Sequence, residues 1–372
     1  MTAGFDLDRL IPPYVKSFEA YRPSPPDTEL CRMYGIERLH RLHNNENPLG
    51  PPPAARAVLA GFEPGRAALY PSGDSFDLRA ALARRWRVDP DQIIVGNGAN
   101  EVIAFAIKAF CQGGDSIVTA DRTFAVAEWV ATFSGIETRL VPLRDDRFDA
   151  EAMLAAIEPG TRILFVCNPN NPTGTYWTAA ETEDFLARVA GRAIVVLDEA
   201  YAEYMDRPDY PDSRALLDRH DNLVIFRTFS KAYGLAGLRI GYLLGAPAVV
   251  EAIRRTAIVY SVNGPGQAAA LAAVEAGDDH LARSRATARA ARTVMEAGLA
   301  RLGLEVKSHH GNFLMARLPI GDTLAQRRLM ARGFSIRPMT AFRYPNWIRI
   351  TLATPELMEA FLPALADVLG RR

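Results

Sequence analysis

The chain of 372 residues is too long for one simple core and favours two covalently linked domains. Lysine plus arginine and aspartate plus glutamate both number 43, so the formal net charge is zero, and no basic bias favours nucleic acid or an anionic membrane. The widely spaced Cys31, Cys111 and Cys167 form no CxxC pair, and the histidines show no metal spacing. We therefore expect a small-molecule role without a disulfide framework or a metal site.

The N-terminal ten residues carry Asp6 and Asp8 and no continuous apolar region, which argues against a signal peptide. No later run approaches the ~20 apolar residues that a membrane-spanning helix needs. We predict a cytoplasmic protein. Residues 1–53 contain four proline clusters and many polar residues, so we expect an N-terminal arm that belongs in part to a small domain and covers the site.

Residues 54–260 alternate helical patterns with short apolar runs, which is typical of strands buried on both faces of a sheet. The sequence predicts a large α/β domain with a mostly parallel sheet. The runs are Ile93–Val95, Ile117–Val118, Ile163–Val166, Ile194–Leu197 and Leu223–Phe226.

Residues 261–372 favour a smaller α+β domain. An alanine-rich stretch from Gly266 to about Leu302 predicts one or two long helices with a break near Gly277. The expected strands and closing helix are Gly311–Leu318, Phe334–Arg337, Trp347–Leu352 and Pro355–Leu369.

Four polar elements follow apolar strands, at the edge where open α/β sheets bind ligands. They are Asn168–Gly174 (NPNNPTG), Asp198–Tyr201 (DEAY), Thr228–Lys231 (TFSK) and Arg239. We therefore expect one site at converging strand ends. Gly96-Asn97-Gly98 does not begin a dinucleotide motif, because Glu101 stands where the third glycine would fall.

The motifs N-P-T-G, D-E-A-Y and S-K-A-Y-G-L-A-G-L-R resemble fold-type-I aminotransferases that use pyridoxal 5′-phosphate (PLP), specifically the histidinol-phosphate aminotransferase branch. The likeness runs from Tyr14 to Arg349. It implies a seven-stranded, mostly parallel sheet and a smaller domain. It also implies a homodimer in which Tyr70 reaches the cofactor phosphate of the neighbouring subunit.

The resemblance implies that Lys231 forms the Schiff base with PLP and then moves a proton. Asp198 would keep the pyridine nitrogen protonated, Tyr201 and Asn171 would bond the phenolic oxygen, and Phe124 would stack on the ring. The start of a helix at Gly98-Ala99-Asn100 offers free N–H groups to the cofactor phosphate. Further phosphate donors would be Thr228, Ser230 and Arg239.

Substrate residues also follow from the resemblance. Arg349 matches the arginine that holds the α-carboxylate of glutamate, and that turns to the phosphate of histidinol phosphate. Arg337 matches an arginine that helps to bind that phosphate. Tyr14 and Asn45 match the arm that folds over the site.

Three departures from the family pattern leave the substrate open. His43-Asn44 stands where the family commonly has a small residue before N-E-N-P, Asn100 replaces a more usual aspartate, and the stretch Lys16–Thr28 is longer and more basic than the short arm expected of the family. His43 is a candidate substrate ligand, although a lone histidine on an arm is more often idle.

We expect an aminotransferase of amino-acid biosynthesis that works between glutamate/2-oxoglutarate and histidinol phosphate, or a related or aromatic amine. One alternative is a PLP decarboxylase similar to threonine-phosphate decarboxylase, which would release carbon dioxide. Another is a PLP-sensing regulator, but the segment before Tyr14 is too short for a helix-turn-helix.

Overall fold

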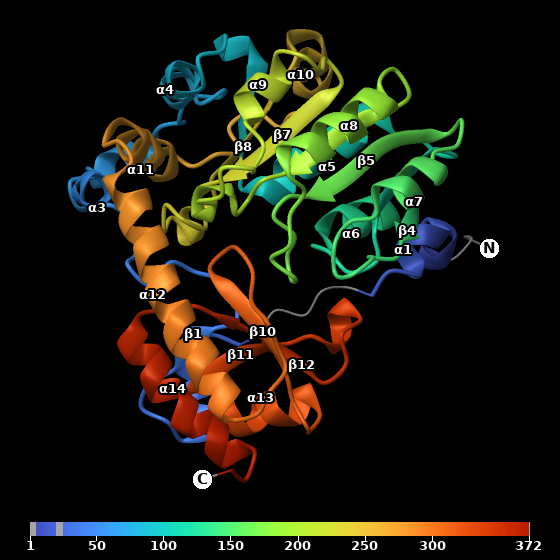
Figure 1. Cartoon of the computed structure of the whole chain (residues 1–372). Coiled ribbons are helices and arrows are strands. Elements are labelled where there is room, and N and C mark those ends of the chain that lie inside the picture. Colours follow the sequence, from blue (N-terminus) through green and yellow to red (C-terminus); the bar gives the residue numbers. More distant parts are fainter. Residues whose placement is uncertain (1–4, 20–24, 372) are drawn as a thin grey trace.

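A computed structural model describes residues 5–19 and 25–371 of the chain, which form two sheets of unequal size, one above the other (Figure 1). Each sheet has its own apolar cluster of buried side chains, so each has its own core. Of the predicted long arm, residues 20–24 lie outside the described residues. In the described part of the chain, no helix is long and apolar enough to cross a membrane.

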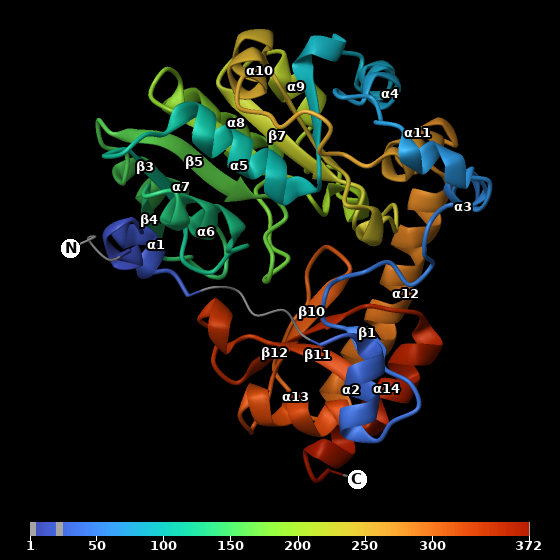
Figure 2. The same ribbon diagram turned by 180° about the vertical axis from the view of Figure 1, so that it is seen from behind.

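The larger sheet has seven strands in the order β2-β8-β7-β6-β5-β3-β4. Neighbours run parallel except that β8 is antiparallel to both β2 and β7. Helix α8 lies in front of the sheet in Figure 1 and α5 in front of it in Figure 2, so both faces are covered and the strands can be apolar throughout. The strands are β2 (Ile93–Gly96), β3 (Ser116–Ala120), β4 (Glu137–Val141), β5 (Thr161–Cys167), β6 (Ile194–Asp198), β7 (Leu223–Thr228) and β8 (Gly241–Gly245).

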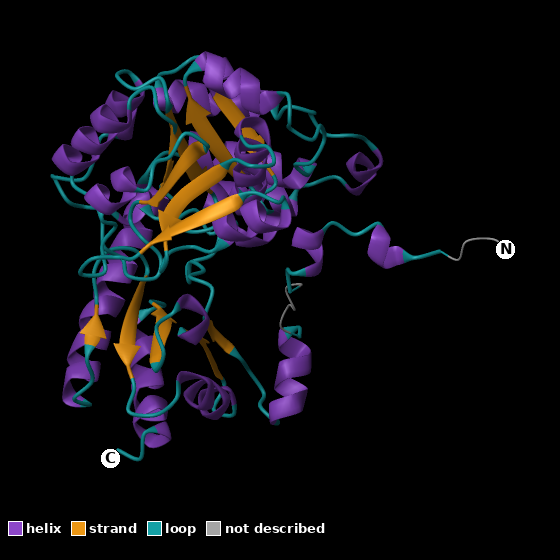
Figure 3. Ribbon diagram, turned by 90° about the vertical axis from the view of Figure 1, so that its right-hand side faces the viewer, coloured by secondary structure: helices purple, strands orange, loops and turns teal. Residues whose placement is uncertain are grey.

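The smaller sheet has five strands in the order β1-β11-β12-β10-β9, with only the β1–β11 pair parallel. Figure 3 shows the two sheets as separate groups of arrows. Its strands are β1 (His40–Leu42), β9 (Val306–Lys307), β10 (Phe313–Arg317), β11 (Phe334–Pro338) and β12 (Trp347–Thr351).

The helices connect and cover these sheets. Asparagine, threonine and aspartate caps begin several of them: Asp149 accepts from the N–H of Ala152, and Thr178 forms a capping box with Glu181. The α-helices are α1 (Pro13–Lys16), α2 (Asp27–Tyr34), α3 (Pro53–Ala60), α4 (Phe76–Trp86), α5 (Ala99–Phe110), α6 (Val126–Phe133), α7 (Ala150–Ala155), α8 (Ala179–Val189), α9 (Ser213–Leu217), α10 (Pro247–Arg254), α11 (Gly264–Glu275), α12 (Asp279–Arg301), α13 (Asp322–Met330) and α14 (Pro355–Val368).

The predicted class, an α/β fold with a seven-stranded, mostly parallel sheet and a smaller domain, is confirmed. The alanine-rich stretch breaks after Glu275, as expected, into α11 and α12. Within the N-terminal arm, His40–Leu42 is a strand of the smaller sheet, and Leu42 is fully buried in its core. The three domain boundaries stay predictions, and α11 packs on α3 and α4 of the larger unit.

Candidate active site

A cavity of about 460 Å³ lies at the carboxyl ends of the central strands of the larger sheet. Polar side chains from both sheets meet there, as the strand-end motifs predict. Of the predicted site residues, the cavity is lined by Ala99, Asn100, Phe124, Asn171, Asp198, Tyr201, Thr228, Ser230, Lys231, Arg239, Arg337 and Arg349.

Lys231 follows β7 and its amine faces the cavity. Nζ donates a hydrogen bond of 2.7 Å to the carbonyl oxygen of Asn44, and no carboxylate of residues 5–19 or 25–371 forms an ion pair with it. Burial, with the nearby positive charge of Arg349 as a second cause, lowers the pKa of Lys231 to about 7. A large fraction of this amine is therefore uncharged at neutral pH and able to act as a nucleophile.

Asp198 is the last residue of β6 and lies beside Cys167, its partner on β5. One carboxylate oxygen accepts the N–H of Ala200 at 3.1 Å, and the Cys167 thiol lies 3.8 Å from the other. Burial raises the pKa of Asp198 to about 6. A carboxylate this basic forms a strong pair with a cationic ring nitrogen.

Tyr201 accepts hydrogen bonds from two amides at its phenolic oxygen. Nδ2 of Asn45 donates at 2.9 Å and Nδ2 of Asn171 at 3.4 Å. Burial raises the pKa of Tyr201 to about 12, so the phenol keeps a proton that it can donate to a ligand. Asn45 is buried behind Tyr201, is bonded to Thr351, and does not line the cavity, so its place differs from the predicted substrate contact.

The other end of the cavity fits an anion. Helix α5 begins after Gly98, whose φ of 80° favours glycine, and a Cβ there would collide with the guanidinium of Arg239. Nη1 of Arg239 donates to Ser230 Oγ at 3.4 Å. The free N–H groups of the helix start, the guanidinium and the hydroxyls of Thr228 and Ser230 therefore form a phosphate-sized set of donors.

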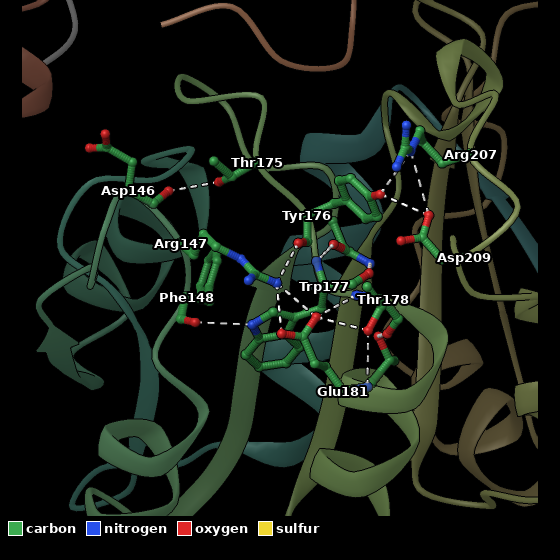
Figure 4. A network of polar contacts seen from close by, with 12 residues as sticks. Asp146, Arg147, Phe148, Thr175, Tyr176, Trp177, Thr178, Glu181, Arg207 and Asp209 are labelled. Carbon is green, nitrogen blue, oxygen red and sulfur yellow. Dashed lines mark hydrogen bonds and ion pairs between the residues drawn. The ribbon is translucent and has the colours of Figure 1, made fainter.

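The loop Asn168–Gly174 carries Asn171 into the cavity and is held by the segment that follows it (Figure 4). Thr175 Oγ1 donates to the carbonyl of Asp146, and the indole of Trp177 donates to the carbonyl of Phe148. Next to them, Arg147 pairs with Glu181 and with the carbonyl of Tyr176. These bonds lie in the larger unit, so the position of Asn171 is fixed by the fold before any ligand binds.

Three arginines of the smaller sheet line the cavity: Arg41 of β1, Arg337 of β11 and Arg349 of β12. The last two contact the segment His43–Asn45. Nη1 of Arg349 donates to Asn171 Oδ1 at 2.6 Å and Nη2 to the carbonyl of His43 at 2.7 Å. Nη2 of Arg337 donates to Asn44 Oδ1 at 3.0 Å. The buried Nε atoms of both arginines have no hydrogen-bond partner among the described residues. Such unpaired donors favour an anion between them.

These residues fit the predicted cofactor. A neutral lysine for the aldehyde, a buried carboxylate for the ring nitrogen, a phenol with an amide for the phenolic oxygen, and an anion cradle for the phosphate all face one cavity. Among the described residues, no group of three or more histidine, cysteine or acidic side chains could hold a metal ion.

Two predicted residues lie away from this cavity. Tyr14 is in α1, which packs on α6 (Figure 2), and its ring lies against Gly135, so it does not line the cavity of this chain; its contact with the substrate stays a prediction. The arm turns toward α6 because Phe18 packs edge-on against Phe133. Tyr70 is 85% exposed, and its ring packs at a tilt against that of Tyr260, with 4.9 Å between the ring centroids.

Nine lining residues were not among the predicted site residues: Arg41, Asn44, Glu46, Cys167, Pro169, Ala200, Ala236, Gly237 and Phe342. Asn44 and Cys167 adjoin recognised motifs, so their proximity was a usable signal. His43, the candidate ligand, contacts Ser335 instead, and burial lowers its pKa to about 4, so it is neutral.

Residues 38–365 match the model of one protein family, "Aminotransferase class I and II". The chain belongs to this family. The predicted aminotransferase activity, with its Lys-Asp-Tyr constellation in one cavity, is thereby confirmed at the level of the family.

Among the relatives of this aminotransferase is "Histidinol-phosphate aminotransferase 1" of Cupriavidus pinatubonensis, 40% identical over 366 residues, or 96% of each chain. "Histidinol-phosphate aminotransferase 2" of Pseudomonas fluorescens is 39% identical over 98% of this chain and 99% of its own. The structure also matches the histidinol-phosphate aminotransferase of Sinorhizobium meliloti in complex with pyridoxal-5′-phosphate, with a TM-score of 0.85, 29% identity and 97% of both chains covered. The cofactor predicted from the sequence is the one present in that complex.

Proposed function

We propose that this aminotransferase uses PLP, held on Lys231, to move an amino group between glutamate/2-oxoglutarate and histidinol phosphate. The observation that carries the proposal is the pair of buried, unpaired Nε atoms of Arg337 and Arg349 in the same cavity as the neutral amine of Lys231. Two guanidinium groups suit a phosphate dianion better than a neutral side chain. The names and the full-length coverage of the curated relatives support the same substrate.

Each side chain would have a defined task. Bound PLP supplies an aldehyde that takes up amino groups and a ring that accepts electrons. Asp198 would hold a proton at the ring nitrogen, and Tyr201 with Asn171 would donate to the phenolic oxygen. Lys231, once released, would move the proton at the substrate Cα. Arg349 would bind the α-carboxylate of glutamate, and Arg349 and Arg337 together the phosphate of the other substrate.

The test is the half-reaction with one amine at a time. The loss of cofactor absorbance measures the transfer of the amino group. We expect conversion with glutamate and with histidinol phosphate, and much slower conversion with phenylalanine. Inertness toward histidinol phosphate would contradict the assigned substrate. Carbon dioxide release from phosphothreonine without amino transfer would instead identify a decarboxylase.

We further propose that the enzyme is a homodimer with shared active sites. Tyr70 is exposed at one edge of the larger unit, next to the exposed apolar side chains Leu69, Ile258, Val259 and Tyr260. An exposed apolar patch of this kind suits a subunit interface. In this arrangement the Tyr70 hydroxyl would reach the cofactor phosphate of the other subunit. The predicted cytoplasmic location stays a prediction.

Co-expression of two inactive or weakened variants tests whether the subunits share active sites. A hybrid of a Lys231→Ala chain and a Tyr70→Ala chain has one site with both residues intact. We expect the hybrid to recover more activity than either parent. If the isolated hybrid dimer is no more active than the Lys231→Ala or Tyr70→Ala protein, Tyr70 has no role across the interface.

A further inference from the structure

A half-buried aromatic ring in the active-site cavity has no task in the proposed function. Phe342 ends the short helix η6 (Thr340–Phe342) and lines the same cavity as Lys231. Part of the ring packs on the small apolar cluster of Met315, Met339, Tyr344 and Trp347. The connection from β11 to β12 therefore joins the two strands that carry Arg337 and Arg349, and it presents Phe342 between them.

The start of this connection is fixed by a buried carboxylate. Asp322, the first residue of α13, is 4% exposed. One of its oxygens accepts the N–H groups of Met339 at 2.8 Å and Thr340 at 2.7 Å, and the other accepts the Thr340 hydroxyl at 2.8 Å. These three hydrogen bonds tie the start of η6 to the buried side chain of Asp322.

The end of the connection is fixed to the larger unit. Arg343 donates to Glu128 Oε1 at 3.0 Å and to the carbonyl of Asp121, and the Tyr344 hydroxyl donates to Asp146 Oδ1 at 2.6 Å. The carbonyl of the same Asp146 also accepts from Thr175, next to the loop that carries Asn171 (Figure 4). The residues on both sides of Phe342 are thus anchored by hydrogen bonds, and Phe342 itself lines the cavity.

We propose that Phe342 is a specificity-determining residue that packs against a planar ring in the side chain of the amine substrate, and that Asp322 positions it. This inference deepens the proposed function and rests on it. A fixed aromatic wall stabilises an imidazole or benzene ring by stacking and by removing its face from water. Glutamate has no ring and gains little from the same wall. Arg337 and Arg349, on the strands that flank this connection, would bind the phosphate of the substrate, and Phe342 would contact its ring. The β11–β12 segment would therefore recognise both groups.

The test compares two pairs of amines that differ only in the ring. Histidinol phosphate is paired with alaninol phosphate, and phenylalanine with alanine. The ratio within each pair, taken from single-turnover rate constants divided by dissociation constants, is the ring selectivity. We expect Phe342→Leu, which keeps apolar bulk, to lower the ring selectivity roughly tenfold, while Phe342→Tyr stays within about twofold of the wild type.

A second readout does not depend on turnover. Calorimetric binding of the same four amines to PLP-loaded Lys231→Ala protein, with and without Phe342→Leu, should show the same change in ring selectivity. Asp322→Ala should also lower ring selectivity while leaving the alaninol phosphate rate within about twofold, because the anion site is untouched. Asp322→Asn, which keeps one acceptor oxygen, should rescue part of the loss and replaces the alanine variant if that variant fails to fold.

The outcomes separate this inference from the proposed function. Equal losses for all four amines in Phe342→Leu, or a wild type without ring selectivity in either pair, would overturn the role of Phe342. A wild type inert to both phosphates but selective for phenylalanine, with that selectivity lost in Phe342→Leu, would support the aromatic wall and overturn only the histidinol phosphate assignment.

Discussion

The two ends of the active-site cavity are built differently. At the cofactor end, Asp198 is the last residue of β6, Lys231 follows β7 and Arg239 precedes β8, so all three belong to one sheet and its connections. The substrate end combines the segment His43–Asn45 with Arg337, Phe342 and Arg349, which come from opposite ends of the chain. The cofactor end is therefore fixed by the larger sheet and its connections, and the substrate end by how the smaller sheet packs against them. Chemistry and specificity should be separable by mutation.

Removing the amine should cause the largest loss, for every substrate alike. Lys231→Ala eliminates both the attachment point of the cofactor and the proton carrier, so we expect amino transfer to fall more than about 10⁴-fold. Borohydride reduction of the wild type followed by peptide mapping should place the cofactor on Lys231. An adduct on Lys16, Lys108 or Lys307 would contradict the assignment.

Neutralising the Asp198 carboxylate should cause the second-largest loss of activity, and the loss should be the same for every substrate. Asp198→Asn keeps the shape of the side chain but removes the charge that stabilises a protonated ring nitrogen, and we expect a loss of about 10²- to 10³-fold in the half-reaction rate. Asp218→Asn, an exposed acid of the same domain, should match the wild type. A loss confined to histidinol phosphate would show that the two ends of the cavity are not independent.

Substitutions at the substrate end should cause a smaller loss of the half-reaction rate, and the loss should differ between substrates. Arg337→Gln leaves the phosphate under-paired at a cost of ~1.5–3 kcal/mol, or about ten- to a hundredfold in the single-turnover rate with histidinol phosphate. Glutamate should lose less, because Arg349 remains for its carboxylate. Arg317→Gln, an exposed arginine of the same small sheet, is the matched control. Equal losses for histidinol phosphate, glutamate and phenylalanine would mean that Arg337 is structural.

The smallest expected effect is the pH dependence of PLP attachment to Lys231. Burial lowers the pKa of Lys231 to about 7, so the uncharged fraction of its amine, and with it the rate of PLP attachment to cofactor-free protein, should rise roughly tenfold from pH 6 to pH 8. The folded pKa lies below the unfolded value, so the unfolded chain binds more protons between them, and this group's contribution to stability rises with pH from about 7 to 10.5. Stopped-flow absorbance measures the attachment rate, and a flat profile would contradict a neutral lysine.

The cofactor end could be predicted from the sequence because each polar motif directly follows a continuous apolar strand. Asp198 and Lys231 are examples, since strand ends of a parallel sheet meet at one edge. Two strands of the same sheet escaped notice. β4 is a partly exposed edge strand with charged residues, and β8 is a five-residue strand bounded by glycines.

The substrate end could be predicted only in part, because its geometry depends on contacts between distant segments. β1 lies within a proline-rich arm, and its burial follows from pairing with β11, almost 300 residues later. Phe342 faces the cavity because of the hydrogen bonds to Asp322. Tyr14 lies near α6 because its arm makes apolar contacts there. No sequence motif indicates these contacts.

The contacts of His43 and Asn44 have a consequence for affinity. The carbonyls of these residues and the amide oxygen of Asn44 already accept hydrogen bonds from Arg349, Lys231 and Arg337. An incoming anion therefore competes with these acceptors for the Nη donors of both arginines, so the net gain from those bonds is small, and only bonds to the unpaired Nε atoms replace no hydrogen bond between the described residues. Weak ground-state binding of this kind leaves interaction energy for the transition state and keeps product release fast.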